Sequence, residues 1–187
     1  MAGPPPGYRP SVNISTTSSA RAANRWLTRY LQDHYVASRG ELELFERCAG
    51  SLQDPHLREE VSALAREATE DRGALLAVME SLDVPDATVQ EQVAVLAERV
   101  GRLKPNGTLV RRSPLSDLVE LEGLTVAVRA KRAAWTALRA VAPAVEVLNP
   151  YHLEHLVDRA DDQEARLEQL RVVVAQRVLA GSEEVQS

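Results

Sequence analysis

The chain has 187 residues, of which 44% are hydrophobic and 26% charged, so it is long enough for one domain with a sizeable core. Its formal net charge of −5 argues against nucleic acid as a partner, because nucleic-acid-binding surfaces are basic. One cysteine, Cys48, excludes an intramolecular disulfide and favours a cytoplasmic protein. No apolar run approaches the roughly 20 residues that span a bilayer, so we expect no membrane insertion.

The composition predicts a single all-α domain with flexible ends. Aromatic residues make up only 4% of the chain, while Ala, Leu and Val are abundant, a mixture that suits helix packing better than a β-sandwich. Residues 1–17 are rich in Pro, Gly, Ser and Thr and are predicted to form a disordered N-terminal arm. We expect the helical domain to span residues 18–180 and a flexible tail to span residues 181–187.

Four prolines mark predicted helix starts. Three follow a residue that caps helix N-termini, in Asp54-Pro55, Ser113-Pro114 and Asn149-Pro150. The side chains of Asp, Ser and Asn accept hydrogen bonds from unpaired N–H groups, and proline at the first helical position loses none, since its missing N–H would have no partner there. The fourth proline, Pro85, comes just before Asp86 and opens a shorter helix.

The apolar periodicity gives the extent of five helices, which we predict at about Ser18–Leu52, Pro55–Leu82, Asp86–Leu103, Pro114–Val141 and Pro150–Ala180. The core-facing stripe of the first helix is predicted to contain Leu31, Tyr35, Ser38, Leu42, Phe45, Ala49 and Leu52. The stripe of the second helix contains Leu57, Val61, Leu64, Ala68, Leu75, Val78 and Leu82. That of the fourth contains Leu121, Leu124, Val128, Trp135 and Leu138, and that of the fifth contains Leu153, Leu156, Ala160, Leu167, Leu170 and Val174.

The connection lengths predict the topology. Short links join the first helix to the second and the fourth to the fifth, which favours two antiparallel hairpins. The long connection between them, residues 83–113, carries the extra short helix. A weak internal repeat agrees with two related hairpins: LAREATEDRGALLAV (64–78) aligns without gaps with LVDRADDQEARLEQL (156–170), so Leu64 matches Leu156 and Leu75 matches Leu167.

The chain resembles the ferritin-like superfamily, and within it the stress-inducible bacterial ferritin-like bundles. The residues that carry this resemblance are LQDHYVASRGELELF (31–45), the Asp54-Pro55-His56-Leu57-Arg58 turn, and EATEDRGALLAVMESL (67–82). The resemblance implies a four-helix bundle with one long crossover. It also implies a dimetal site built from a Glu on each of two helices and a Glu-x-x-His motif on each of the other two.

That metal motif is degenerate in this sequence. At the corresponding positions the second helix has Ala68-Thr69-Glu70-Asp71 and the fifth has Ala160-Asp161-Asp162-Gln163, so neither helix supplies a histidine. Counting residues along each helix from the end of the bundle places four polar residues at heights that differ by no more than about 6 Å along the bundle axis. We therefore predict a polar layer at mid-bundle, in place of the metal site, formed by Ser38, Asp71, Lys131 and Gln163.

Within this layer, two interpretations of Lys131 stay open. In the first, its ammonium group replaces the lost cations and pairs with Asp71, because a buried charge without a partner costs several kcal/mol. In the second, Lys131 reaches the surface and Asp71 is solvated.

A metal site remains as an alternative. If the helix register differs from the one above, a carboxylate-only site could use Glu41, Glu67, Glu70, Glu122 and Asp162; carboxylates alone suit Mg, Ca or Mn. His152 and His155 are three residues apart on the fifth helix and could hold zinc at the surface, although we favour surface or capping roles. No phosphate-binding loop, nucleophile elbow or paired-cysteine motif is present.

Basic residues recur every four positions near the start of the first helix, at Arg21, Arg25 and Arg29. They form either a docking surface for an acidic partner or a phosphate, or simply an exposed helix start. Together these patterns predict a non-catalytic bundle without a cofactor that acts through protein–protein contact, with a second copy of the chain as one possible partner. The alternative is a metal-binding ferritin-like oxidoreductase or iron-handling protein.

Overall fold

The computed structural model describes the backbone of residues 14–85 and 113–181, and it describes side chains in 25–85 and 113–181 except at position 114. These residues form four α-helices, α1 (Ile14–Ser51), α2 (Pro55–Ser81), α4 (Pro114–Val141) and α5 (Pro150–Leu179), and the short 3-10 helix η1 (Ala142–Ala144). No strand occurs in these two ranges. The all-α prediction is confirmed.

The helix boundaries follow the proline positions closely. α2, α4 and α5 begin at Pro55, Pro114 and Pro150, as predicted. α1 begins at Ile14, four residues before the expected start at Ser18 and inside the predicted N-terminal arm. Once a helix is nucleated, each added residue gains a backbone hydrogen bond, so it can extend through weak helix formers such as Ser and Thr. The predicted helix 86–103 and the tail after residue 181 lie outside the described residues.

Asp54 and Asn149 act as side-chain caps, as the sequence indicated, whereas the bond at Ser113 runs from its backbone to another side chain. Asp54 accepts hydrogen bonds from the backbone N–H groups of His56 and Leu57, at 2.9 and 3.2 Å. Asn149 accepts from the second and third residues of α5, at 3.0 and 3.2 Å. At α4, the Ser113 N–H donates to the Ser116 hydroxyl, at 3.2 Å. The start of each of these three helices is therefore fixed by local hydrogen bonds.

α2 ends in a Schellman motif at Asp83. The N–H of Val84 donates to the Met79 carbonyl at 2.9 Å, and that of Asp83 donates to Glu80 at 3.1 Å. Asp83 has a φ of 52°, a left-handed conformation that glycine adopts at lower cost. Val84 is buried after this turn, which fixes the direction in which the chain leaves α2.

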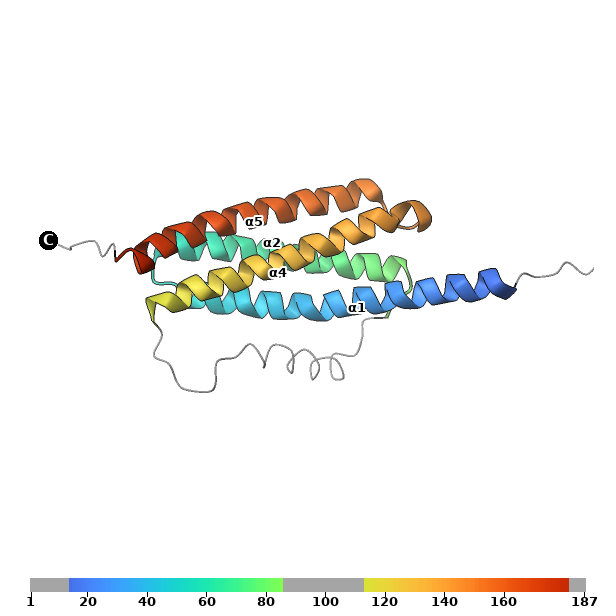
Figure 1. Ribbon diagram of the computed structural model, residues 1–187, viewed down its shortest axis with the longest axis horizontal. Coiled ribbons are helices and arrows are strands. Elements are labelled where there is room, and N and C mark those ends of the chain that lie inside the picture. The colour runs from blue at the N-terminus through green and yellow to red at the C-terminus, as the bar shows by residue number, and fades with distance from the viewer. Residues whose placement is uncertain (1–13, 86–112, 182–187) are drawn as a thin grey trace, which may run out of the picture.

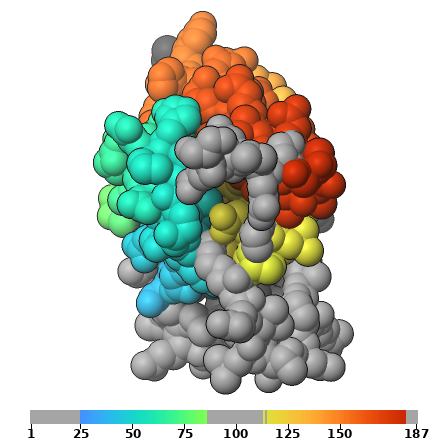
Figure 2. Space-filling model, turned by 90° about the vertical axis from the view of Figure 1, so that its left-hand side faces the viewer, coloured from blue at the N-terminus to red at the C-terminus, as the bar shows by residue number. Residues whose placement is uncertain are grey.

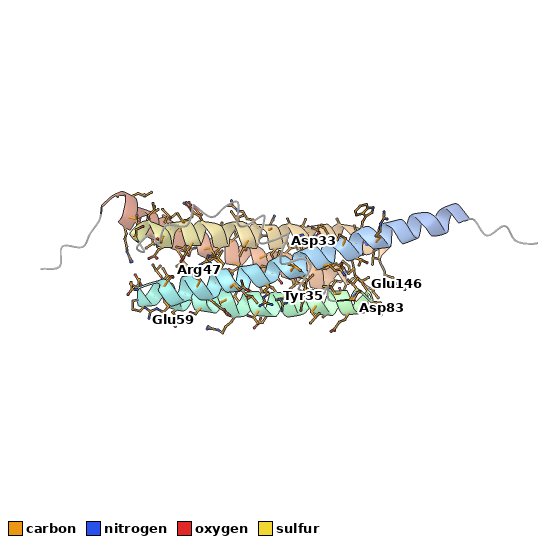
Figure 3. The ribbon with its side chains drawn as sticks, turned by 90° about the horizontal axis from the view of Figure 1, so that it is seen from below. Asp33, Tyr35, Arg47, Glu59, Asp83 and Glu146 are labelled. Carbon is orange, nitrogen blue, oxygen red and sulfur yellow. The ribbon has the colours of Figure 1, made fainter. Side chains whose placement is uncertain are left out.

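The four helices lie side by side along the length of the molecule (Figure 1). α1 packs against α2 and α4, and α5 packs against α4 and α2. The end of α2 and the connection between α4 and α5 share one end of the molecule, where Asp83 and Glu146 lie; Glu59 lies near the other end (Figure 3). Figure 2 views this other end, with α2 and α5 in its upper part and α1 in its lower part.

The apolar core is divided into two clusters, one toward each end of the molecule. The first cluster is built around large side chains that include Leu31, Leu75, Trp135, Leu138, Leu153 and Leu156. The second includes Phe45, Leu64, Leu121, Leu124, Leu167 and Leu170. On each helix the change from one cluster to the other falls at a buried polar residue. The fold therefore places a polar layer between two apolar halves.

The predicted core stripes of α4 and α5 are buried throughout, and that of α2 is buried except for Leu82, which is partly buried. The predicted stripe of α1 is only partly buried at three of its seven positions, Ser38, Leu42 and Ala49. Glu41 and Cys48 are buried, whereas Leu42 and Ala49, chosen because they are more apolar or small, are only partly buried. A glutamate is rarely buried unless it is paired, and the partner of Glu41 is on another helix. No helix in the described part of the chain is long and apolar enough to cross a membrane.

Candidate functional site

The candidate site is the polar layer between the two apolar clusters. Each helix contributes one buried polar residue: Glu41 from α1, Asp71 from α2, Lys131 from α4 and Gln163 from α5. Between 91% and 99% of each residue's surface is buried, since their exposed fractions run from 9% for Lys131 to 1% for Gln163. Burying polar groups costs free energy unless they find hydrogen-bond or ion-pair partners, so the contacts among these four side chains matter for stability.

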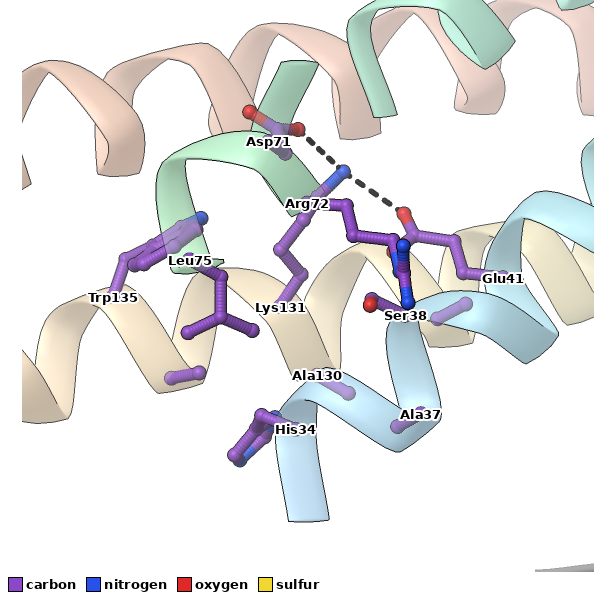
Figure 4. A pocket seen from close by; sticks show the side chains of 12 residues that line it. His34, Ala37, Ser38, Glu41, Asp71, Arg72, Leu75, Ala130, Lys131 and Trp135 are labelled. Atoms are coloured by element: carbon purple, nitrogen blue, oxygen red, sulfur yellow. Dashed lines mark hydrogen bonds and ion pairs between the residues drawn. The ribbon is translucent and has the colours of Figure 1, made fainter. Parts of the chain in front are cut away.

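Lys131 lies at the centre of the layer. Its Nζ atom is 2.7 Å from Asp71 Oδ2 and 2.8 Å from Glu41 Oε1, so a single ammonium group joins carboxylates from two helices (Figure 4). The expected ion pair between Lys131 and Asp71 is therefore present, and the interpretation in which Lys131 reaches the surface is wrong. Since an unpaired buried charge costs several kcal/mol, the three side chains depend on one another.

Asp71 is also held from the opposite side. Its second oxygen, Oδ1, pairs with the Arg159 guanidinium of α5, and Gln163 Nε2 donates to its Oδ2 at 3.1 Å. The same Gln163 amide donates to Glu67 at 3.1 Å, and Glu67 in turn pairs with Arg166 at 2.7 Å. The layer thus continues from the core to the surface between α2 and α5.

Ser38 is the one predicted member that the structure does not link to the others. Its hydroxyl group donates to the Tyr35 carbonyl of its own helix at 2.7 Å. The residue is only half buried, although it lies beside the layer (Figure 4). Glu41, about one turn further along α1, takes the expected place, because its longer side chain reaches Lys131.

Burial changes the protonation behaviour of the layer. The pKa of Glu41 is raised above its ordinary value of 4.5, chiefly because burial penalises the carboxylate. The ammonium of Lys131 acts in the opposite direction, and the nearby Asp71 raises the pKa further. Glu41 therefore takes up a proton more readily than a solvated glutamate as the pH falls.

A crevice of about 90 Å³ opens beside Lys131 and reaches the surface at Ala37 and Ala130, which are both exposed. Its lining comes from α1, α2 and α4 and consists of His34, Ala37, Ser38, Glu41, Asp71, Arg72, Leu75, Ala127, Ala130, Lys131, Ala134 and Trp135 (Figure 4). Burial lowers the pKa of His34 from 6.5, so this imidazole is neutral near pH 7. The Arg72 guanidinium stacks over the Tyr35 ring at 4.2 Å.

The alternative carboxylate ligands are each occupied by a basic side chain. Besides Glu41 with Lys131 and Glu67 with Arg166, Glu70 lies 3.3 Å from Arg159, Asp162 lies 3.3 Å from Arg166, and Glu122 lies 3.8 Å from Arg171. Among the described residues, no group of three or more His, Cys, Asp and Glu side chains is placed to hold a metal ion. The five carboxylates are thus distributed over four basic side chains, with Glu67 and Asp162 sharing Arg166.

The remaining candidates lie away from the layer. His152 and His155 are exposed in the first turns of α5. On α1, the Arg25 guanidinium stacks on the Trp26 ring at 4.9 Å, and Arg29 pairs with Asp33 at 3.1 Å. Arg21 lies on the same helix, but its side chain is outside the described residues. The charge of Arg29 is therefore partly neutralised within α1, which weakens the argument for a basic docking surface there.

Sequence reasoning missed the two arginines of α5, Arg159 and Arg166, that complete the network. The internal repeat aligns Glu67 of α2 with Arg159 of α5, but in the structure Arg159 pairs with Glu70 and Asp71 rather than with Glu67. Comparison of the chain with protein-family models, with curated proteins and with solved structures gave no match.

Proposed function

We propose that this chain is a ferritin-like bundle of two antiparallel hairpins in which an ion-paired network occupies the position of the dimetal site, and that it acts through protein–protein contact without a catalytic metal. The observation that carries the proposal is the position of Lys131. Its ammonium group lies within 2.8 Å of carboxylates from two helices, as a metal cation between bridging carboxylates would.

The helix directions support the ferritin-like part of the proposal. α1 and α2 run in opposite directions in Figure 1, as do α4 and α5, whereas α2 and α4 run in the same direction. Such a path needs one long connection between two hairpins, which residues 82–113 supply in length. α1 also packs against α4, and α2 against α5, so all four helices surround the layer.

The internal repeat supports the same topology at the level of single contacts. Its alignment matches Glu67 with Arg159 and Asp71 with Gln163. In the structure Glu67 bonds to Gln163 and Asp71 bonds to Arg159, so exchanging the two repeats converts one contact into the other. A pair of contacts with this reciprocity is expected where two related helices meet about a local two-fold axis.

The network also argues against metal chemistry at this position. A metal ion would have to displace Lys131, which breaks its two buried ion pairs, with Glu41 and with Asp71. The rival proposal, a metal-binding oxidoreductase or iron-handling protein, requires that this rearrangement occurs when iron or manganese is present.

Metal analysis of the protein purified from its native host tests the proposal. We expect less than about a tenth of an equivalent of iron, manganese or zinc per chain after dialysis against a chelator. Near-stoichiometric metal that survives this dialysis would establish the rival. The Lys131→Ala variant, purified in parallel, is the control. It leaves Glu41 and Asp71 without the ammonium group, so metal found in this variant but not in the wild type would show that the procedure itself does not strip a bound metal.

A further inference from the structure

The outward face of α4 exposes apolar residues along most of its length. Leu115, Val119 and Val126 lie on it with 48%, 55% and 65% of their surfaces exposed. Further along, Ala133, Ala137 and Ala140 are exposed on the same side of the helix. The spacings of four, seven, seven, four and three residues keep all six on one stripe, which we call the outer α4 face.

The other helices carry more charge along their outward sides. α2 exposes Arg58, Glu59, Arg66 and Glu70, and the first half of α5 exposes Glu154, Asp158, Asp161 and Asp162. The second half of α5 also exposes apolar side chains, Val172, Val173 and Leu179. On α4, exposed apolar residues recur along most of a 28-residue helix, and a stripe of this length is typical of a surface that binds a partner.

The sizes of the side chains on the outer α4 face point to one partner in particular. The large residues Leu115 and Val119 lie in its N-terminal half, and the small residues Ala133, Ala137 and Ala140 lie in its C-terminal half. If a second copy packs in the antiparallel direction with Val126 on the two-fold axis, Val119 meets Ala133 and Leu115 meets Ala137 of the second copy. Large side chains then pack against small ones, whereas a parallel pair would place alanine against alanine.

The charges on the same face agree with this arrangement. Glu122 and Arg129 are the charged residues that lie within the stripe, and both are exposed. Within one chain each already faces α5, since Arg129 pairs with Glu164 at 2.7 Å and Glu122 lies 3.8 Å from Arg171, so a second copy would add a further partner to each. They lie four residues before and three residues after Val126, so the antiparallel arrangement brings Glu122 of one copy close to Arg129 of the other. An oppositely charged pair, Glu122 of one copy and Arg129 of the other, therefore forms on each side of the two-fold axis.

We infer that the outer α4 face is a self-complementary interface through which two copies of this chain form an antiparallel dimer with Val126 on the two-fold axis. This inference rests on the proposed function in that it names the partner of a protein that acts by contact. It does not depend on the polar layer, because none of the interface side chains belongs to it.

Sedimentation of the full chain measures the dimer directly. We expect a mass of twice 20.5 kDa at micromolar concentrations. Val126→Lys places two like charges together on the axis and should weaken self-association at least about tenfold. Val172→Lys makes the same change at an exposed valine of α5 and should leave the dimer intact.

Cysteine substitution tests the antiparallel direction. Val126→Cys should form a disulfide with itself under mild oxidation, because this position alone faces its own copy. Val119→Cys should not cross-link with itself but should cross-link when mixed with Ala133→Cys. The native Cys48 is buried and gives little background.

A monomeric wild-type chain at every concentration would overturn the inference and would mean that another segment or another protein covers this face. Self-cross-linking of Val119→Cys as strongly as Val126→Cys would overturn the antiparallel arrangement. Neither result bears on the metal content of the layer, so failure of the dimer and failure of the metal-free proposal are separate outcomes.

Discussion

The Lys131 ammonium lies 2.7 Å from the Asp71 carboxylate, and both side chains are more than nine-tenths buried. Each is also bound by a further partner: Lys131 by Glu41 and Asp71 by Arg159. Glu41, Lys131, Asp71 and Arg159 therefore form a chain of alternating charges across α1, α4, α2 and α5, with no net charge. A substitution that leaves a net charge in this chain should cost more stability than one that does not.

Removal of the central cation should be costly. Lys131→Met leaves Glu41 as a buried carboxylate without a partner, and we expect the free energy of unfolding to fall by about 3–5 kcal/mol. Adding Glu41→Gln should recover a large part of this loss, because the remaining pair of Asp71 and Arg159 is neutral. Urea denaturation of the two variants measures both values.

A matched double variant sharpens this test. Lys131→Met combined with Asp71→Leu leaves Glu41 charged without Lys131, and leaves Arg159 with only the exposed Glu70 as an ion-pair partner. It should therefore recover less stability than Lys131→Met combined with Glu41→Gln. If the effects of the single substitutions simply add in both double variants, the three groups do not act as one network.

The raised pKa of Glu41 predicts a pH dependence with a definite sign. The folded state binds this proton more tightly than the unfolded state, so the contribution of Glu41 to stability falls as the pH rises from about 4.5 through the raised pKa. Glu41→Gln has no titrating group here. The difference in unfolding free energy, wild type minus variant, should therefore decrease with rising pH in this range; an increase would contradict the assignment.

His34 predicts the opposite dependence. Burial lowers its pKa in the folded state, so its contribution to stability is present above pH 6.5 and is lost as the pH falls through the lowered pKa. His34→Gln should weaken the loss of stability below pH 6.5 that the wild type shows. Thermal denaturation at several pH values, with His56→Gln as the exposed control, checks this; equal slopes for wild type and His34→Gln would argue against it.

The end of α2 offers a stabilising substitution. Asp83 holds the left-handed conformation that closes the Schellman motif, and its side chain is exposed. Asp83→Gly should raise the unfolding free energy by about 0.5–1 kcal/mol, because glycine adopts this conformation without a steric penalty. Asp83→Ala, which keeps the penalty, serves as the control, and a gain of the same size in both variants would refute the explanation.

The sequence predicted the helices well because their starts are encoded locally. Asp54, Ser113 and Asn149 each precede a proline, and the hydrogen bonds of such caps depend only on the next few residues. The interior of α1 was harder. A single sequence favours Leu42 over Glu41 for burial, and only the position of Lys131 on another helix reverses that choice.

The candidate site was predicted in part because three of its residues can be recognised from the sequence of their own helix. Asp71, Lys131 and Gln163 interrupt otherwise apolar stripes, so each is visible on its own helix. Arg159 and Arg166 lie at the edge of α5, where charged residues are normally solvated, and their roles depend on which carboxylates of α2 face them. Which carboxylates face these arginines depends on how α2 and α5 pack, and the weak internal repeat is the one sequence feature that bears on this packing.

The central claim is that the Lys131 ammonium takes the place of a metal cation. Calorimetric titration with Mn²⁺ tests it most directly, with wild type and Lys131→Ala compared under identical conditions. We predict no binding to the wild type and a single site in Lys131→Ala, whose freed Glu41 and Asp71 carboxylates face the space that the ammonium filled. Stoichiometric binding of Mn²⁺ by the wild type, lost in a variant with Glu41→Gln, would contradict the claim.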